Sequence, residues 1–168
     1  MNKGTKIALI AFALLITVTV PVYFYMRQNA GQEGIIQVKG TVNNPANVTF
    51  SELKTLPSVT VQVTLTSSSS PSENGVFNYT GVPVRDLIEQ TGAVENATSV
   101  YVQASDGYGI TIPMQEIMQN EKALLAYEKD GEPLKTLAEG GEGPVRLVIA
   151  TDEFAQRWIK SVAVIEVK

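Results

Sequence analysis

The chain has 168 residues, of which 44% are hydrophobic and 18% are charged, a balance typical of one packed domain with a short apolar extension. The formal net charge is -4 and Lys and Arg do not cluster, so the sequence argues against nucleic-acid binding. Because Cys and His are both absent, the chain can form no disulfide, Cys/His zinc site, iron–sulfur site, Ser-His-Asp triad or Cys-His pair.

The N-terminal part contains an apolar run, Ile7–Tyr25, that is close to the ~20 residues needed to span a bilayer as a helix. Lys3 and Lys6 precede it and only Arg27 follows closely, which predicts a cytoplasmic N-terminus and an exported C-terminal part. We therefore expect residues 1–29 to be a single-pass membrane anchor. A cleaved signal peptide and a core helix are the alternatives, but the bulky aromatic end of the run is atypical of a cleavage site.

Residues 30–34 are predicted to be a polar linker, and residues 35–168 one extracytoplasmic domain. Alternating or continuous apolar patterns predict strands over 35–42, 60–66, 99–104, 109–112, 123–127, 144–149 and 159–167. Start and stop signals predict short helices over 51–56, 82–92 and 113–118. Asp-Gly pairs predict tight turns at 106–107 and 130–131. Strands outnumber helices without strict alternation, which indicates an α+β, mostly β domain.

Local signals support two of these helices. Thr49 and Glu52 have the spacing of a capping box at the start of the first helix. Pro83 suits the first turn of the second helix, and Gly92 suits its C-terminal cap.

Three Asn-x-Ser/Thr sequons begin at Asn47, Asn78 and Asn96. In an exported domain they are candidate N-glycosylation sites, provided that the organism has the machinery. The motif is short, and chance occurrence is the alternative.

Five segments carry a family resemblance, in the order 79–88 (YTGVPVRDLI), 106–113 (DGYGITIP), 124–134 (LLAYEKDGEPL), 143–148 (GPVRLV) and 160–167 (KSVAVIEV). Together they resemble the molybdopterin-binding domain of the sulfite oxidase family, over roughly residues 35–167. The resemblance implies a mixed α+β fold rich in short strands. It also implies a molybdenum, or rarely tungsten, cofactor carried by a pterin dithiolene, a Cys thiolate ligand to the metal, and oxygen-atom transfer.

The resemblance also implies roles for individual residues. Tyr108 stands at the family's active-site tyrosine and is the candidate catalytic residue. Arg146 holds the family's PVR position, and Lys160 and Ser161 lie in a segment that approaches the pterin, so these three are candidate cofactor-binding residues.

Three of these residues have structural alternatives. Tyr108 follows an Asp-Gly turn and would simply complete a hairpin, and Ser161 would be an ordinary strand residue. Arg146 lies in an apolar strand, where a structural ion pair with Asp86 or Glu128 is the expected alternative.

The chain departs from the family at the metal ligand. The Cys of relatives falls between the second strand and the YTGVP segment, where residues 66–74 offer serines instead. Ser67 and Ser68 are the candidates at this position, although a hydroxyl is a poorer ligand than a thiolate for a soft metal–sulfur centre. The upstream Arg/His segment that grips the pterin has no counterpart, and Ala163 replaces a Lys of the C-terminal motif.

These observations predict a membrane-anchored extracytoplasmic domain that binds a ligand or a protein partner without catalysis. The partners expected are the membrane, through the N-terminal helix, and a membrane or extracytoplasmic protein, with no nucleic acid. The alternative is an active molybdopterin-dependent oxidoreductase or redox partner with a serine or an open position in place of the Cys. A third hypothesis, a hydrolase, would use carboxylates whose spacing selects no pair: Asp106, Glu128, Asp130 and Asp152.

Overall fold

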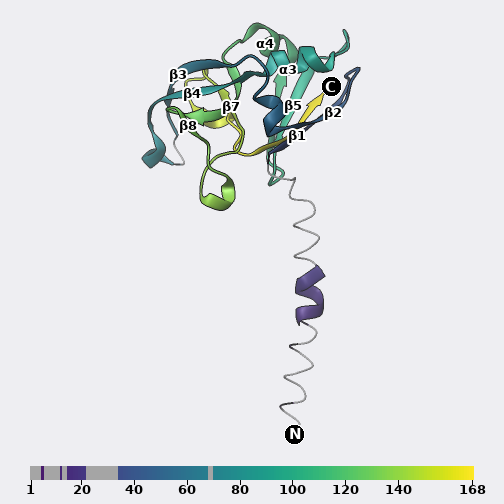
Figure 1. Ribbon diagram of the computed structural model, residues 1–168, viewed down its shortest axis with the longest axis vertical. Helices are drawn as coiled ribbons and strands as arrows, with labels where there is room; N and C mark the ends of the chain where they lie inside the picture. The colour runs from purple at the N-terminus through teal and green to yellow at the C-terminus, as the bar shows by residue number, and fades with distance from the viewer. Residues whose placement is uncertain (1–4, 6–11, 13–14, 22–33, 68–69) are drawn as a thin grey trace. The chain divides into compact units, whose positions relative to one another are not determined.

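The computed structural model describes residues 5, 12, 15–21, 34–67 and 70–168 (Figure 1). The chain forms two compact units, Met1–Gly31 and Gln32–Lys168. In the first unit residues 15–21 are helical. Within the described residues, no helix is long and apolar enough to cross a membrane. Much of the predicted anchor, Ile7–Tyr25, lies outside those residues, so the anchor stays a prediction.

The second unit contains two five-stranded sheets. The first has the order β2-β1-β10-β5-β6, in which β1 and β10 are parallel and the other pairs are antiparallel. Its strands are β1 (Ile35–Gly40), β2 (Ala46–Thr49), β5 (Ser99–Ala104), β6 (Gly109–Pro113) and β10 (Val162–Val167). The Asp106-Gly107 turn joins β5 to β6, as the sequence predicts.

The second sheet is antiparallel, with the order β3-β4-β7-β8, and β9 pairs with β7. Its strands are β3 (Val59–Leu65), β4 (Gly75–Pro83), β7 (Ala123–Lys129), β8 (Glu132–Pro133) and β9 (Arg146–Ile149). Sequence patterns miss β4 because Gly, Asn and Pro, which it contains, are depleted in strands. Pairing on both sides, with β3 and β7, overrides that local preference. The short edge strand β2 is missed as well.

Short helices connect the strands. The α-helices are α2 (Phe50–Leu53), α3 (Val84–Thr91) and α4 (Met114–Gln119), and the 3-10 helices are η1 (Pro71–Glu73), η2 (Leu137–Glu139) and η3 (Ala155–Arg157). The capping box of Thr49 and Glu52 is confirmed at α2. Gly92 ends α3 with φ of +68°, which favours glycine, so its predicted capping role is also confirmed.

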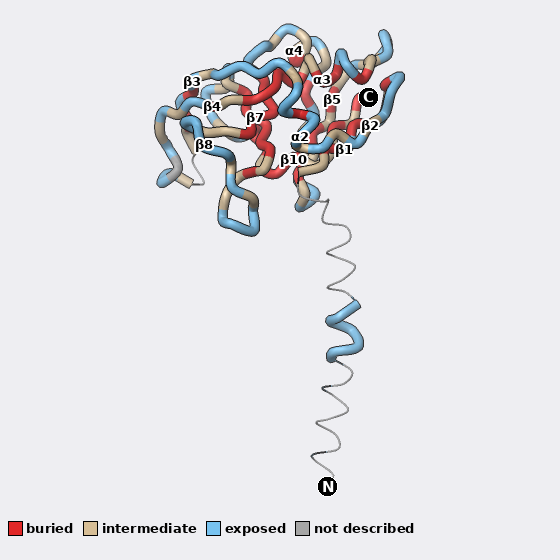
Figure 2. Tube along the Cα trace, viewed as in Figure 1, coloured by how far each residue is buried: buried red, intermediate tan, exposed pale blue. Residues whose placement is uncertain are grey.

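One apolar core draws on both sheets, as the buried segments in the interior of Figure 2 show. α3 contributes Val84, Leu87 and Ile88, all completely buried on the face that the sequence predicts. Tyr79 of β4 meets Trp158 edge-to-face, with ring centroids 5.9 Å apart. The structure thus confirms the prediction of a mostly-β, mixed α+β fold. The rings of Tyr79 and Trp158 form the part of the core that lies beside the start of β9.

Gly81 provides a test of this packing. The register of β4 against β7 shifts between Thr80 and Gly81. A methyl group at Gly81 would collide with the Leu125 carbonyl oxygen and lie 2.5 Å from Cα of Ala126. We expect Gly81→Ala to lower the free energy of unfolding in urea by about 1–3 kcal/mol through overpacking. Val76→Ala, at a side chain that is 60% exposed, is the control and should change it by less than about 0.5 kcal/mol. Equal stability of the two variants would contradict the close strand approach.

Candidate functional site

A pocket of about 260 Å³ opens where the loop after β3, the β5–β6 turn, the start of β9 and the segment around η3 come together. Its lining residues are Ser67, Ser70, Ala104, Asp106, Tyr108, Arg146, Ala155, Trp158 and Lys160. Four residues that the sequence predicts for a site therefore meet in one place, although they come from separate segments. They are Ser67, Tyr108, Arg146 and Lys160.

The other two predicted site residues are not part of this lining. Ser68 lies outside the residues that the structure describes. Ser161 is buried next to the pocket, in the left-handed conformation with φ of +48°. Its hydroxyl accepts a hydrogen bond from the Ser105 hydroxyl at 3.0 Å, and its backbone N–H donates to the Glu142 carbonyl at 2.9 Å. Ser161 thus connects two loops of the site.

Arg146, at the start of β9, is the central cation of the pocket, and only 3% of it is exposed. Its Nη1 forms an ion pair with the Glu142 carboxylate and donates to the Tyr79 hydroxyl at 3.3 Å. The Tyr79 hydroxyl in turn donates to the same Glu142 carboxylate at 3.3 Å. One edge of the guanidinium is therefore held by a closed triangle formed by Arg146, Glu142 and Tyr79.

The prediction of Asp86 or Glu128 as the partner of this arginine is wrong. Asp86 accepts a hydrogen bond from Arg85 Nε at 3.2 Å, and Glu128 lies 3.9 Å from Lys54 Nζ. The actual partner, Glu142, belongs to a Gly-rich loop that shows no periodic pattern in the sequence. Only the folded path of that loop brings its carboxylate into the interior, which is why sequence reasoning misses it.

Aromatic rings enclose the guanidinium of Arg146. Its Cζ lies 5.2 Å from the ring centroid of Trp158 and 5.9 Å from that of Tyr79. The Trp158 indole N–H is held by the Ile149 carbonyl at 3.1 Å. Trp158 is a site residue that sequence reasoning misses, although the single Trp of the chain was a usable signal.

The Nε atom of Arg146 is buried and has no hydrogen-bond partner among the described residues. Buried polar groups are nearly always satisfied, so this donor stands out as one for which the described residues supply no acceptor. Arginine carries only donors, and the group that completes it must therefore be an acceptor.

The surrounding charges fix the protonation of the triangle. Burial alone would raise the pKa of Glu142, but Arg146, Lys129 and Lys160 together hold that pKa below its ordinary value. Burial raises the pKa of Tyr79 far above its ordinary value, which keeps the hydroxyl neutral. The triangle therefore combines an ionised carboxylate, a guanidinium and a neutral phenol.

Tyr108 stands at the mouth of the pocket and is 57% exposed. Its backbone N–H donates to the Asp106 carboxylate at 2.9 Å, which stabilises the turn between β5 and β6. The turn-forming interpretation and the site interpretation of Tyr108 are therefore compatible. Asp106 itself lines the pocket and adds one negative charge to it.

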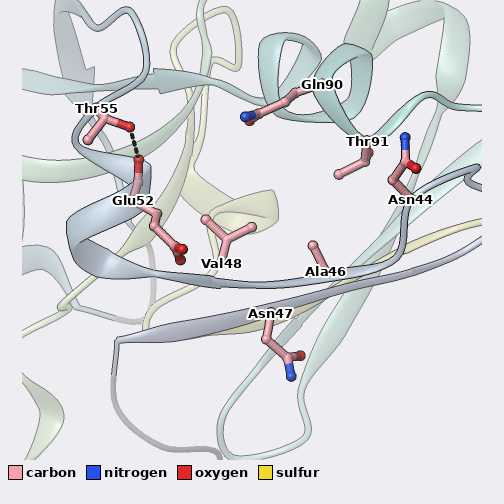
Figure 3. A pocket seen from close by; sticks show the side chains of 8 residues that line it. All are labelled: Asn44, Ala46, Asn47, Val48, Glu52, Thr55, Gln90 and Thr91. Carbon is pink, nitrogen blue, oxygen red and sulfur yellow. Dashed lines mark hydrogen bonds between the residues drawn. The ribbon is translucent and has the colours of Figure 1, made fainter.

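A second pocket, of about 380 Å³, lies between β2, α2 and the end of α3 (Figure 3). The Glu52 carboxylate there accepts the backbone N–H and the hydroxyl of Thr49, both at 2.8 Å, as part of the α2 cap. Figure 3 shows Asn47 on the opposite side of β2 from Ala46 and Val48. This pocket presents no cationic side chain among its lining residues, so the smaller pocket around Arg146 is the stronger candidate site.

Residues 30–168 match the family model described as oxidoreductase molybdopterin binding domain. The chain belongs to this family. An uncharacterized oxidoreductase, YuiH, from Bacillus subtilis (strain 168) is 30% identical over 101 residues, which cover 59% of this chain and 49% of that protein. The sulfane dehydrogenase SoxCD from Paracoccus pantotrophus shares the fold, with a TM-score of 0.68 and 22% identity. That match covers 79% of this chain and 37% of the SoxCD chain. The matched part of this chain spans about half the length of YuiH.

The pocket fits the polar parts of a molybdopterin better than it fits the metal. Arg146 Nε, Lys160 and the two serine hydroxyls are donors suited to an anionic or heteroatom edge. The chain has no thiolate or imidazole to offer a metal, and in its described part no group of three or more acidic residues is placed to hold one. The donor set therefore does not match the thiolate-ligated centre that the family resemblance implies.

The three sequons lie at the surface of the domain. Asn47 is exposed on β2, Asn78 is exposed on β4, and Asn96 is exposed in the turn before β5. Exposure is necessary for modification, and glycosylation of these residues stays a prediction.

The Glu142–Arg146 pair should give the protein a defined acid sensitivity. Because the folded-state pKa of Glu142 is lowered, its contribution to stability is present above the ordinary value of 4.5 and is lost as the pH falls through the folded value. We expect Glu142→Gln to be less stable at neutral pH and to lose less stability on acidification than the unmodified protein. Urea unfolding between pH 7 and pH 3 measures both. Glu132→Gln, at an exposed carboxylate of β8, is the control and should keep the original pH dependence. An unchanged acid slope in Glu142→Gln would contradict the pairing.

Proposed function

We propose that this chain is a membrane-anchored, extracytoplasmic binding module that uses the molybdopterin-binding fold without its redox catalysis. The observation that carries this proposal is the make-up of the pocket around Arg146. Its cationic and hydroxyl donors are in place, whereas the chain contains no thiolate for the metal. Such a site favours binding of a ligand through charge and hydrogen bonds over chemistry at a metal–sulfur centre.

In this proposal the pocket residues have distinct binding roles. Arg146 supplies a buried donor whose orientation is set by Glu142, Tyr79 and Trp158. Lys160 adds a second cation to the lining, and Tyr108 covers part of the mouth. Tyr108, which the family resemblance makes a candidate catalytic residue, here contacts the ligand.

An active molybdopterin-dependent oxidoreductase, or a redox partner, is the second candidate. One observation favours it: Ser67 and Ser70 belong to the loop that carries the metal ligand in relatives, and they line the same pocket as Arg146 and Lys160. The similar solved structure is a sulfane dehydrogenase, an activity stated for that protein. A serine or an open position would then stand where the thiolate does in relatives.

The proposed membrane attachment and export rest on the sequence. The apolar run at Ile7–Tyr25 has two lysines before it, which supports a cytoplasmic N-terminus. The unit Gln32–Lys168 is compact by itself, as a domain carried by a separate anchor needs to be. The membrane and a membrane or extracytoplasmic protein are the proposed partners, and Asn47, Asn78 and Asn96 are proposed glycan acceptors in that compartment.

The decisive test of this proposal is the cofactor content of the full chain produced in a host that makes molybdopterin. We expect less than about 0.1 equivalent of molybdenum or tungsten by elemental analysis, and no pterin fluorescence after oxidation, because the thiolate that would fix the metal is absent. A family member that has the ligand Cys, purified from the same host, would serve as the matched control for cofactor supply. Stoichiometric metal together with pterin would overturn the binding-module proposal in favour of the oxidoreductase.

The proposed anchor is tested by fractionation of cells that express the full chain or a chain beginning at residue 32. We expect the full chain to sediment with membranes and to resist alkaline carbonate, because an apolar run of that length partitions into the bilayer. The shorter chain, which keeps the folded unit Gln32–Lys168, should remain in the supernatant. Loss of the first 30 residues from the mature full chain, measured by mass spectrometry, would instead indicate a cleaved signal peptide.

A further inference from the structure

We infer that the pocket around Arg146 selects a small, singly charged oxyanion, such as a carboxylate, over a doubly charged one, and that Glu142 sets this limit. The inference rests on the proposed binding function, because it names the class of ligand for the same site.

The need for an anionic acceptor follows from Arg146. Its Nε is buried without a partner among the described groups, and the residue lines the pocket. The Nη1 atom is already engaged by the Glu142 carboxylate and the Tyr79 hydroxyl. Any ligand in the pocket must therefore meet the guanidinium away from the edge that Nη1 occupies.

The charge of the ligand follows from the charges that surround it. Arg146 and Lys160 are positive and line the pocket, and Asp106, also in the lining, is negative. Glu142 is held ionised against Arg146. The two cations that line the pocket thus meet two carboxylates before any ligand arrives. Lys129 is a third cation near this group, because it helps to lower the pKa of Glu142 and its Nζ lies 3.7 Å from the Phe77 ring centroid and 5.7 Å from that of Tyr79, but it is not among the lining residues.

A balanced pocket tolerates one added negative charge far better than two. The cost of removing an ion from water rises steeply with its charge, and only an uncompensated cation can offset that cost. A dianion would also face the Glu142 carboxylate across the guanidinium and the Asp106 carboxylate in the lining. Glu142 therefore acts as an internal counter-charge that limits the ligand to a monoanion.

The size of the pocket points to a small molecule. Its volume of about 260 Å³ is below the ~300–1,000 Å³ typical of sites for drug-sized ligands. The hydroxyls of Ser67 and Ser70 lie in the lining and offer further hydrogen bonds to oxygen atoms. A short carboxylate satisfies the size, the charge and the need for an acceptor together.

The test is titration of the full chain, purified in detergent, with sodium formate, acetate or sulfate at constant ionic strength and pH 7, followed by calorimetry. We expect formate and acetate to bind at least tenfold more tightly than sulfate. Glu142→Gln should raise the affinity for sulfate at least fivefold relative to formate, because it leaves Arg146 without its counter-charge. Glu132→Gln, which removes a carboxylate outside the pocket, should leave this ratio unchanged.

A second variant keeps the test valid if Glu142→Gln fails to fold. Asp106→Asn removes an exposed charge from the pocket but keeps the amide oxygen that can accept the Tyr108 N–H. It should shift the ratio toward sulfate in the same direction.

Three outcomes would overturn the inference. They are sulfate binding as tightly as formate in the unmodified protein, a ratio that neither variant shifts, and no binding of any of the three anions. These outcomes are separable from failure of the proposed function, which is decided by molybdenum and pterin content. A cofactor-free protein without anion selectivity would reject this inference alone, whereas a cofactor-loaded protein would reject the binding-module proposal whatever the anion titrations show.

Discussion

The buried ion pair between Arg146 and Glu142 is the interaction on which the candidate site depends. A guanidinium inside an apolar core is unfavourable unless its charge is balanced and its donors are satisfied. Glu142 supplies the balance, and Tyr79 bonds to both members of the pair. The pair fixes the path of the Gly-rich loop beside β9, and the Trp158 ring covers the guanidinium. One donor, Nε, is buried and has no acceptor among the described residues, while Arg146 as a residue lines the pocket.

This arrangement is consistent with the proposal that this member of the oxidoreductase molybdopterin-binding family has a binding pocket but no thiolate ligand for a metal. The fold needs Arg146 and its partners for packing and charge balance, because they occupy the junction between β4, β7 and β9. The loop after β3, by contrast, borders the pocket at the surface, and its serines can replace other residues without opening the core. Under the proposed function, the serines of this loop would leave the metal without a thiolate ligand while the cationic part of the pocket around Arg146 remains.

Much of the fold could be predicted from local chemistry. The capping box at Thr49, the Gly92 cap and the Asp106-Gly107 turn are each decided by a few adjacent residues, and the structure confirms all three. Strand β4 could not be predicted, because its Gly, Asn and Pro residues form a strand only when β3 and β7 pair with both edges.

The candidate site shows the same division between local and long-range information. Tyr108, Arg146 and Lys160 were predicted through the family resemblance, and the pocket brings them together. Glu142 was missed because its place in the interior depends on how a glycine-rich loop folds back. The wrong partners predicted for Arg146 show that a charge in an apolar strand reveals the need for a counter-ion but not its identity.

The central claim is that Arg146 is a buried cation that lines the pocket and binds an anionic ligand there. Nitrogen-15 NMR of the arginine Nε–H groups measures this directly, with Arg146→Lys identifying the resonance by its disappearance. The account predicts a Nε–H signal that exchanges slowly with water, because the side chain is only 3% exposed, and that shifts in a saturable manner when formate is added. A signal that exchanges as fast as those of surface arginines, or one that formate leaves unchanged, would contradict the account.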